Sequence, residues 1–253
     1  QKGKFELIES LPSDGIGVLN RDDPKQVSYK LKNKVKLVWI GIEAEDVDVR
    51  ATDIKCNNKG TTFNIIFKGD KKKYEFQTKL LGKHNVYNIL AAVALGREFG
   101  ITVKELQQAV SSVRAVEHRL EFVKEVNNVK YYNDTEATNI KCTQIALSSF
   151  NEPTILILGG YERGQDFNLL LPFTNNVKTI IAIGETKDRV EDFAIKNNIT
   201  CYKFETLKES FTKIKEIIKP GDVVLLSPAS ASWDQYNRCE ERGDEFKKYV
   251  NTL

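Results

Sequence analysis

From residue 120 to the C-terminus, short apolar runs alternate with longer stretches whose apolar residues recur at helical spacing. The apolar runs predict strands at Phe122–Val126, Val129–Tyr132, Thr154–Leu158, Thr179–Ile183, Ile199–Phe204 and Val223–Leu226. Helices are predicted at Ile140–Phe150, Lys187–Lys196, Leu207–Ile218 and Asp234–Val250, with a short one near Leu169. Strands separated by helices pair in parallel through right-handed crossovers. This pattern predicts an α/β fold with a doubly wound, mainly parallel, Rossmann-like sheet.

The first 116 residues have a different pattern. After a short strand at Gly17–Asn20, alternating strands with intervening turns are predicted at Lys36–Ile42, Val47–Cys56, Thr61–Phe67 and Lys73–Thr78. They indicate a small antiparallel sheet. Two helices follow, one over Val86–Phe99 with Asn85 as a candidate cap and one capped by Thr102. We therefore predict two domains, 1–116 and 117–253.

Composition limits the class of protein. The 253 residues include 38 basic and 35 acidic side chains, and a net charge of +3 gives no case for binding nucleic acid or an anionic membrane. No apolar run is long enough to span a membrane. Four scattered cysteines and two histidines argue against zinc and are typical of the reducing cytoplasm. The chain has no methionine and begins with Gln1, so we take its start as artificial.

Polar loops follow three predicted strands of the second domain, at Asp134–Asn139, Gly159–Asp166 and Ser227–Asp234. The carboxyl ends of strands in an open α/β sheet are where ligands bind. The first loop opens a helix at Thr138 and Asn139, the second carries Arg163, and the third is expected to open the last helix. Simple helix capping would explain each loop taken separately. Their convergence at one edge predicts a site for a small anionic ligand.

Two familiar phosphate-binding motifs are absent from the sequence. Gly159-Gly160 is not part of a G-x-G-x-x-G fingerprint, and no G-x-x-x-x-G-K-S/T run occurs.

Three further motifs occur one after another along the chain, outside the three loops. They are Asn20-Arg21-Asp22-Asp23, Gly82-Lys83-His84-Asn85 with Asn88, and Glu117-His118-Arg119-Leu120. Together with the three loops they resemble the Mur ligases, ATP-dependent amide ligases of cytoplasmic peptidoglycan precursor synthesis. The runs Tyr132–Asn139, Gly159–Phe167 and Leu225–Phe246 are similar to the D-glutamate-adding members. The opening, Lys2–Leu7, looks more like the D-Ala-D-Ala-adding members.

The resemblance implies that D-glutamate is added to UDP-N-acetylmuramoyl-L-alanine through an acyl phosphate. The alternatives are a D-Ala-D-Ala-adding or other ligase of the family, and an incomplete fragment or chimera that only binds. Residues 1–116 would be the C-terminal part of the central ATP-binding domain. The phosphate loop would then lie upstream of Gln1, so the full-length protein would be the ligase and this chain alone is expected to be inactive.

The resemblance also implies roles for individual residues. Lys2 and Arg119 would be catalytic, and Lys2, when carbamylated, would help to hold Mg²⁺. ATP would be bound by Asn20, Arg119 and Asp134, and the amino acid by Thr138, Asn139, Arg163, Ser232 and Trp233. Glu136 and Arg163 depart from the family pattern because both positions are usually lysine. A cytoplasmic monomer is expected.

Overall fold

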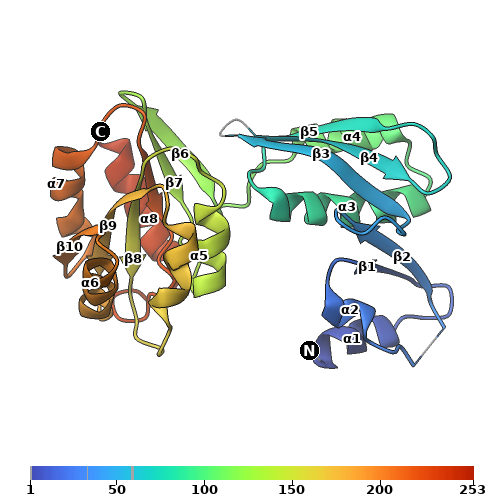
Figure 1. Ribbon diagram of the computed structural model, residues 1–253, viewed down its shortest axis with the longest axis horizontal. Coiled ribbons are helices and arrows are strands. Elements are labelled where there is room, and N and C mark those ends of the chain that lie inside the picture. The colour runs from blue at the N-terminus through green and yellow to red at the C-terminus, as the bar shows by residue number, and fades with distance from the viewer. Residues whose placement is uncertain (1, 33, 58–59) are drawn as a thin grey trace. The chain divides into compact units, whose positions relative to one another are not determined.

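The computed structural model describes residues 2–32, 34–57 and 60–253, with the side chains of Lys2 to Lys4 outside the described part. The chain divides into two compact units, Gln1–Arg114 and Ala115–Leu253, close to the division expected at residue 116. Figure 1 labels most of the helices and strands of both units. Each unit has a sheet and a core of its own. No helix in the described ranges is long and apolar enough to cross a membrane.

The first unit contains a five-stranded mixed sheet in the order β1-β2-β3-β4-β5. Its strands are β1 (Ile16–Asn20), β2 (Lys36–Gly41), β3 (Val49–Asn57), β4 (Gly60–Phe67) and β5 (Tyr74–Thr78). β3, β4 and β5 pair antiparallel, as predicted. The prediction was wrong for β2, which pairs in parallel with both β1 and β3. β2 and β3 share only two residue pairs, Ile40 with Val49 and Gly41 with Arg50, where the end of one strand meets the start of the other.

The helices of this unit are α1 (Lys2–Glu9), α2 (Pro24–Val27), α3 (Lys83–Glu98) and α4 (Val103–Ser112). α3 contributes Val86, Leu90 and Val93 to the core that it shares with the sheet. It begins earlier than predicted, after Gly82 at φ +85°, and Asn85 is not its cap. The capping box of Thr102 and Glu105 confirms the predicted start of α4.

The second unit contains a six-stranded sheet in the order β10-β9-β8-β11-β7-β6. Its strands are β6 (Glu121–Val126), β7 (Val129–Asn133), β8 (Thr154–Gly159), β9 (Val177–Ile183), β10 (Thr200–Phe204) and β11 (Val223–Leu226). All neighbours are parallel except β6 and β7, which form a hairpin. The hairpin turn is Asn127-Asn128, both with positive φ, as a two-residue turn requires. The predicted doubly wound, mainly parallel sheet is confirmed.

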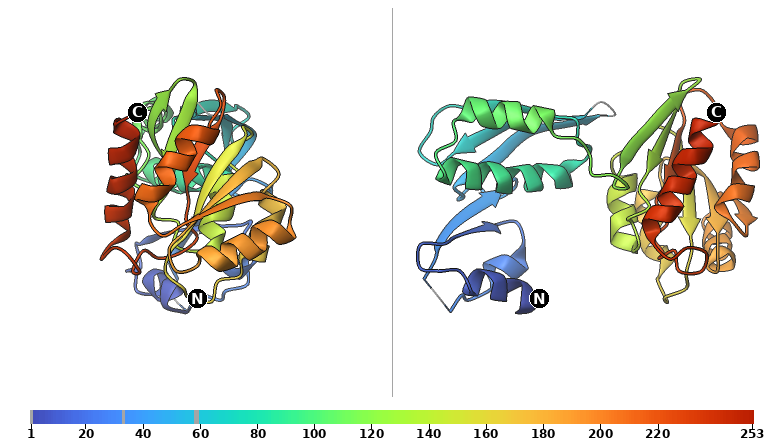
Figure 2. Two further views of the ribbon diagram at one scale, coloured as in Figure 1. Left: turned by 90° about the vertical axis from the view of Figure 1, so that its left-hand side faces the viewer. Right: turned by 180° about the vertical axis from the view of Figure 1, so that it is seen from behind.

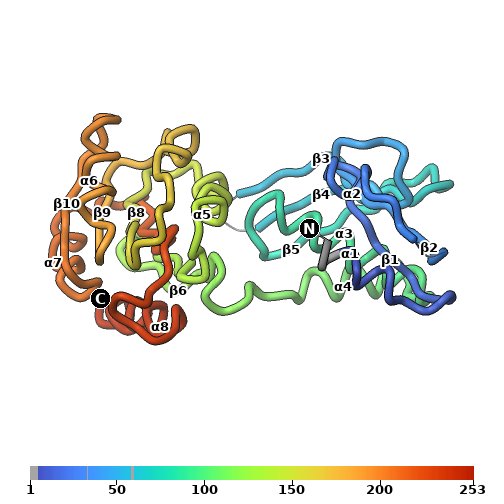
Figure 3. The backbone as a smooth tube through the Cα atoms, turned by 90° about the horizontal axis from the view of Figure 1, so that it is seen from below, coloured from blue at the N-terminus to red at the C-terminus, as the bar shows by residue number. Residues whose placement is uncertain are grey.

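Helices cover both faces of this sheet, as Figures 1 and 2 show. They are α5 (Ile140–Leu147), the 3₁₀ helix η1 (Phe167–Phe173), α6 (Lys187–Lys196), α7 (Leu207–Ile217) and α8 (Cys239–Asn251). On one face Phe211 of α7 and Phe246 of α8 pack 5.7 Å apart over buried isoleucines of β8 and β9. α8 contacts β6 and β7, so the last helix closes the unit beside its hairpin (Figure 3).

Candidate functional site

The carboxyl ends of β7, β8 and β11 lie side by side because these strands are parallel neighbours. Backbone hydrogen bonds join the loops that follow them. The N–H of Gly159 donates to the carbonyl of Pro228, and that of Tyr161 to the carbonyl of Ala231, both at 2.9 Å. The N–H of Asp134 donates to the carbonyl of Leu226 at 2.8 Å. The structure therefore brings the three polar loops together at one edge of the sheet.

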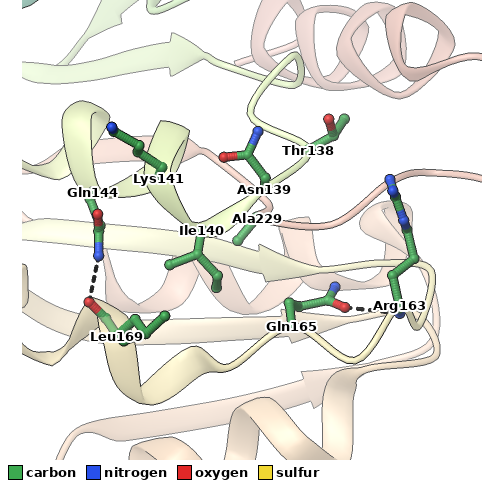
Figure 4. A pocket seen from close by; sticks show the side chains of 9 residues that line it. All are labelled: Thr138, Asn139, Ile140, Lys141, Gln144, Arg163, Gln165, Leu169 and Ala229. Carbon is green, nitrogen blue, oxygen red and sulfur yellow. Dashed lines mark hydrogen bonds between the residues drawn. The ribbon is translucent and has the colours of Figure 1, made fainter. Parts of the chain in front are cut away.

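A pocket of about 390 Å³ opens at this edge, between the start of α5 and the loop after β8 (Figure 4). Its lining residues are Thr138, Asn139, Ile140, Lys141, Gln144, Arg163, Gln165, Leu169 and Ala229. Three predicted site residues, Thr138, Asn139 and Arg163, are among them. The lining contains two cations and no carboxylate, so its chemistry suits an anionic ligand.

Asn139 shapes one wall of the pocket. It is the N-cap of α5, and its side-chain oxygen accepts a hydrogen bond from the N–H of Cys142 at 3.1 Å. Its oxygen is thus engaged in holding the helix start. The positive end of the helix dipole faces the same side, which further favours an anion there.

Arg163 and Trp233 come from different loops but lie together. The guanidinium of Arg163 is 5.4 Å from the centre of the Trp233 ring, and Tyr161 packs on the same ring at 5.7 Å. Trp233 remains 61% exposed. The stacked ring orients the cation while leaving its edge N–H groups available to a ligand.

Ser232 is 1% exposed, and its hydroxyl has no hydrogen-bond partner within the described parts of the chain. A buried polar group without a partner costs free energy, so each such group calls for an explanation. A ligand or a water molecule that bonds the hydroxyl would provide one. Ser232 is absent from the pocket lining, but its neighbour Ala231 is bonded to the loop that carries Arg163.

The third loop does not open the last helix, which corrects the prediction that α8 begins at Asp234. The helix begins at Cys239, and the preceding segment is irregular. The guanidinium of Arg242 in α8 donates to the carbonyls of Ser230 at 3.0 Å and Ala231 at 3.3 Å, and so ties this irregular loop to the helix.

Arg242 also holds the first loop, because it donates to the hydroxyl of Thr135 at 3.0 Å and to its carbonyl at 3.1 Å. The side chain is 1% exposed, and burial lowers its pKa to about 10, so it stays charged near neutral pH. Sequence reasoning missed this residue. Its spacing was the available signal, because Arg242 precedes Phe246 and Val250 on the buried stripe of the helix.

Asp134 is buried at the end of β7, with 7% of its surface exposed. One carboxylate oxygen accepts from the N–H of Leu120 at 3.1 Å and the other from the hydroxyl of Ser227 at 2.7 Å. Burial raises the pKa of Asp134 to about 7, against the lowering effect of these bonds and of Arg119. The residue predicted to contact a ribose thus ties two loops together, and its burial does not fit direct contact with a nucleotide.

The predicted His-Arg pair is divided between interior and surface. His118 is 7% exposed, and its Nδ1 lies 3.0 Å from the side-chain nitrogen of Asn133. Arg119 is exposed, and its guanidinium lies 3.5 Å from the carboxylate of Glu136. His118 therefore anchors the turn, while Arg119 remains accessible to a ligand.

Asn20 lies in the first unit, at the end of β1. Its side-chain oxygen accepts from the N–H of Asp22 at 3.0 Å, and its own N–H donates to the side chain of Gln26 at 2.8 Å. No hydrogen bond from its side-chain nitrogen appears within the described ranges, so that nitrogen is available to a base. The side chain of Lys2, the predicted metal-holding residue, lies outside the described part of the chain.

Asp22 organises the loop next to Asn20. Its carboxylate accepts hydrogen bonds from the hydroxyl of Tyr87 and from three backbone N–H groups, those of Ile42, Glu43 and Ala44, at 2.6 to 3.1 Å. Partial burial raises the pKa of Asp22, but these hydrogen bonds outweigh it and the net pKa is lowered. The carboxylate of Asp22 therefore has a mainly structural role, because it holds the backbone of residues 42–44 beside the loop.

Solved structures with this arrangement define the class. The chain aligns with a MurF ligase from Thermotoga maritima in complex with ADP at a TM-score of 0.76 and 17% identity, over 99% of this chain and 57% of that one. It aligns with a MurF from Acinetobacter baumannii at a TM-score of 0.74 and 17% identity, over 98% and 55%. At this identity the likeness concerns the fold, which is that of Mur-type ligases.

The sequence matches the Mur ligase middle domain over residues 1–96 and the Mur ligase glutamate ligase domain over residues 118–230. The chain belongs to the Mur ligase family. It is 45% identical over 189 residues to a UDP-N-acetylmuramoylalanine–D-glutamate ligase of Shouchella clausii, over 75% of this chain and 42% of that protein. It is 36% identical to the enzyme of that name from Oenococcus oeni, over 98% and 55%. The chain thus spans about half the length of these relatives.

Proposed function

We propose that this protein is part of an ATP-dependent ligase that joins D-glutamate to UDP-N-acetylmuramoyl-L-alanine, and that the second unit binds the D-glutamate. The observation that carries the proposal is the pocket at the strand ends, which has two cations and no acid in its lining. The relatives named for this reaction support it. The reaction would place the protein in the cytoplasm, and we expect a monomer.

In this proposal Arg163 pairs with a carboxylate of D-glutamate, with its guanidinium oriented by Trp233. Thr138 and Ser232 donate hydroxyl hydrogen bonds, and Asn139 keeps the start of α5 in place. The chemical step is attack of the amine on the carbonyl carbon of the phosphorylated L-alanine carboxylate. A C–N bond forms, the C–O bond to phosphate breaks, and the amine loses a proton. The residues of this chain act mainly by positioning and charge neutralisation.

ATP supplies the phosphoryl group that activates the carboxylate. Asn20 and Arg119 fit a role in binding it, because each presents an accessible polar group. Asp134 fits a positioning role better than a ribose contact, for the reasons of burial given above. The binding of Mg²⁺ by carbamylated Lys2 remains a prediction from the resemblance.

The test is ligation by the full-length protein with ATP, Mg²⁺ and UDP-N-acetylmuramoyl-L-alanine. The amino acids compared are D-glutamate, L-glutamate, D-aspartate and D-Ala-D-Ala, and phosphate release and coupled product are both measured. We expect D-glutamate to be preferred over D-Ala-D-Ala by at least about tenfold in kcat/KM, because the pocket offers two cations and D-Ala-D-Ala has only one carboxylate. Preference for D-Ala-D-Ala would reassign the protein within the family.

A further inference from the structure

The two cations of the pocket lie on different walls. Arg163 belongs to the loop after β8, and Lys141 is the second residue of α5. Figure 4 shows them on opposite sides of the pocket, with Ile140 and Ala229 between them. A ligand with one carboxylate could pair with only one of these cations.

Lys141 is free to serve a ligand. It is exposed, and within the described ranges its amino group makes no hydrogen bond or ion pair. Its amino group points outward in Figure 4, but the four-carbon stem of an exposed lysine rotates readily. The nearby start of α5 adds the partial positive charge of the helix dipole.

No carboxylate of the site cancels the charge of Lys141. Glu136 precedes α5, but its carboxylate lies 3.5 Å from the guanidinium of Arg119 and accepts a hydrogen bond from the thiol of Cys239 at 3.4 Å. Glu136 is not among the lining residues. The pocket therefore keeps two positive charges.

We infer that Lys141 is a specificity-determining residue, which pairs with a second carboxylate of the incoming amino acid on the side opposite Arg163. This inference rests on the proposed function, since it deepens the role of the same pocket. Two cations separated by an apolar floor select a dicarboxylic amino acid over one with a neutral side chain. Lys141 thus contacts the side-chain carboxylate, the group that distinguishes D-glutamate from D-glutamine.

The experiment measures binding of D-glutamate, D-aspartate and D-glutamine by calorimetry to the wild type and to Lys141→Gln, Lys141→Arg and Lys208→Gln. Lys208 is a matched control, because it is an exposed lysine at the second residue of α7. We expect Lys141→Gln to raise the Kd for D-glutamate about fivefold, as for a solvent-accessible ion pair, and the Kd for D-glutamine less than about twofold. Lys141→Arg should retain most of the affinity, and Lys208→Gln all of it. The effect should shrink in about 0.5 M salt.

Ligation kinetics give a second readout. In the full-length protein, Lys141→Gln should raise the KM for D-glutamate by the same factor and leave kcat and the KM for ATP unchanged. Equal effects on D-glutamate and D-glutamine, an effect no larger than that of Lys208→Gln, or no binding of either dicarboxylate would overturn the inference. A wild-type protein that binds dicarboxylates through Lys141 but does not ligate D-glutamate would instead refute the proposed function alone.

Discussion

Two arginines of the second unit illustrate two uses of the same side chain. Arg242 is 1% exposed, and its guanidinium bonds four oxygen atoms of two loops. Arg163 is exposed, lies over the Trp233 ring and lines the pocket. The guanidinium of Arg242 is thus engaged within the protein, whereas that of Arg163 has no hydrogen-bond partner in the described part of the chain. The edge of this sheet therefore has two parts. The rigid part, around Arg242, is hydrogen-bonded within the protein, and the part around Arg163 presents polar groups that can bind a ligand.

The largest expected effect comes from removing the rigid part. Arg242→Met removes four buried hydrogen bonds and leaves the carbonyls of Thr135 and Ser230 without this donor, so the free energy of unfolding of the second unit should fall by about 4 kcal/mol. Chemical denaturation followed by Trp233 fluorescence, in a Trp39→Phe background, measures it. Arg163→Met is the matched control and should change this free energy by less than about 0.5 kcal/mol. Equal losses in the two variants would contradict the comparison.

The next effect concerns Asp134, which belongs to the rigid part. Burial raises its folded pKa to about 7, above the unfolded value of about 3.9. The folded state therefore binds more protons between these values, and its stability falls as pH rises through this window. The wild type should lose about 2 kcal/mol of unfolding free energy between about pH 5 and pH 8 relative to Asp134→Asn. A pH-independent difference between the two proteins would show that Asp134 is ionised throughout.

Substitution of Ser232 should affect ligand binding but not the stability of the fold. Ser232→Ala removes a buried hydroxyl that has no partner in the described part of the chain, so the free energy of unfolding should stay within about 0.5 kcal/mol or rise slightly. The Kd for D-glutamate should increase about tenfold, because a hydrogen bond to a charged group is lost. Thermal unfolding and calorimetry measure the two quantities. If Ser232→Ala lowered the unfolding free energy without raising the Kd, Ser232 would be a structural residue of the rigid part and not a ligand-binding one.

The smallest effect is expected at Glu136, which pairs with Arg119 and does not line the pocket. Glu136→Lys should change the Kd for D-glutamate by less than about threefold, since a charge outside the pocket acts through solvent. A larger gain in affinity would mean that position 136 reaches the substrate. Glu136→Gln is the control that removes the acid without adding a cation.

Local pattern was enough to predict the sheet of the second unit. The alternation of strands and helices led to the parallel sheet, and Asn127-Asn128 led to the hairpin. The prediction failed at β2, which pairs in parallel with both β1 and β3, and at α8, which begins at Cys239. The first error concerns pairing between residues distant in the sequence, such as Ile16 with Lys36.

The sequence by itself determined that polar loops follow three strands and that Thr138, Asn139 and Arg163 belong to them, because strand direction alone places these loops at one edge. Tertiary structure decided which polar groups are buried and hydrogen-bonded within the protein. Asp134 and Arg242 are buried and bonded, whereas the amino group of Lys141 and the hydroxyl of Ser232 have no partner among the described residues. The physical reason is that solvation and hydrogen bonding depend on every neighbour in space. A side chain's type and its position along the chain do not reveal those neighbours.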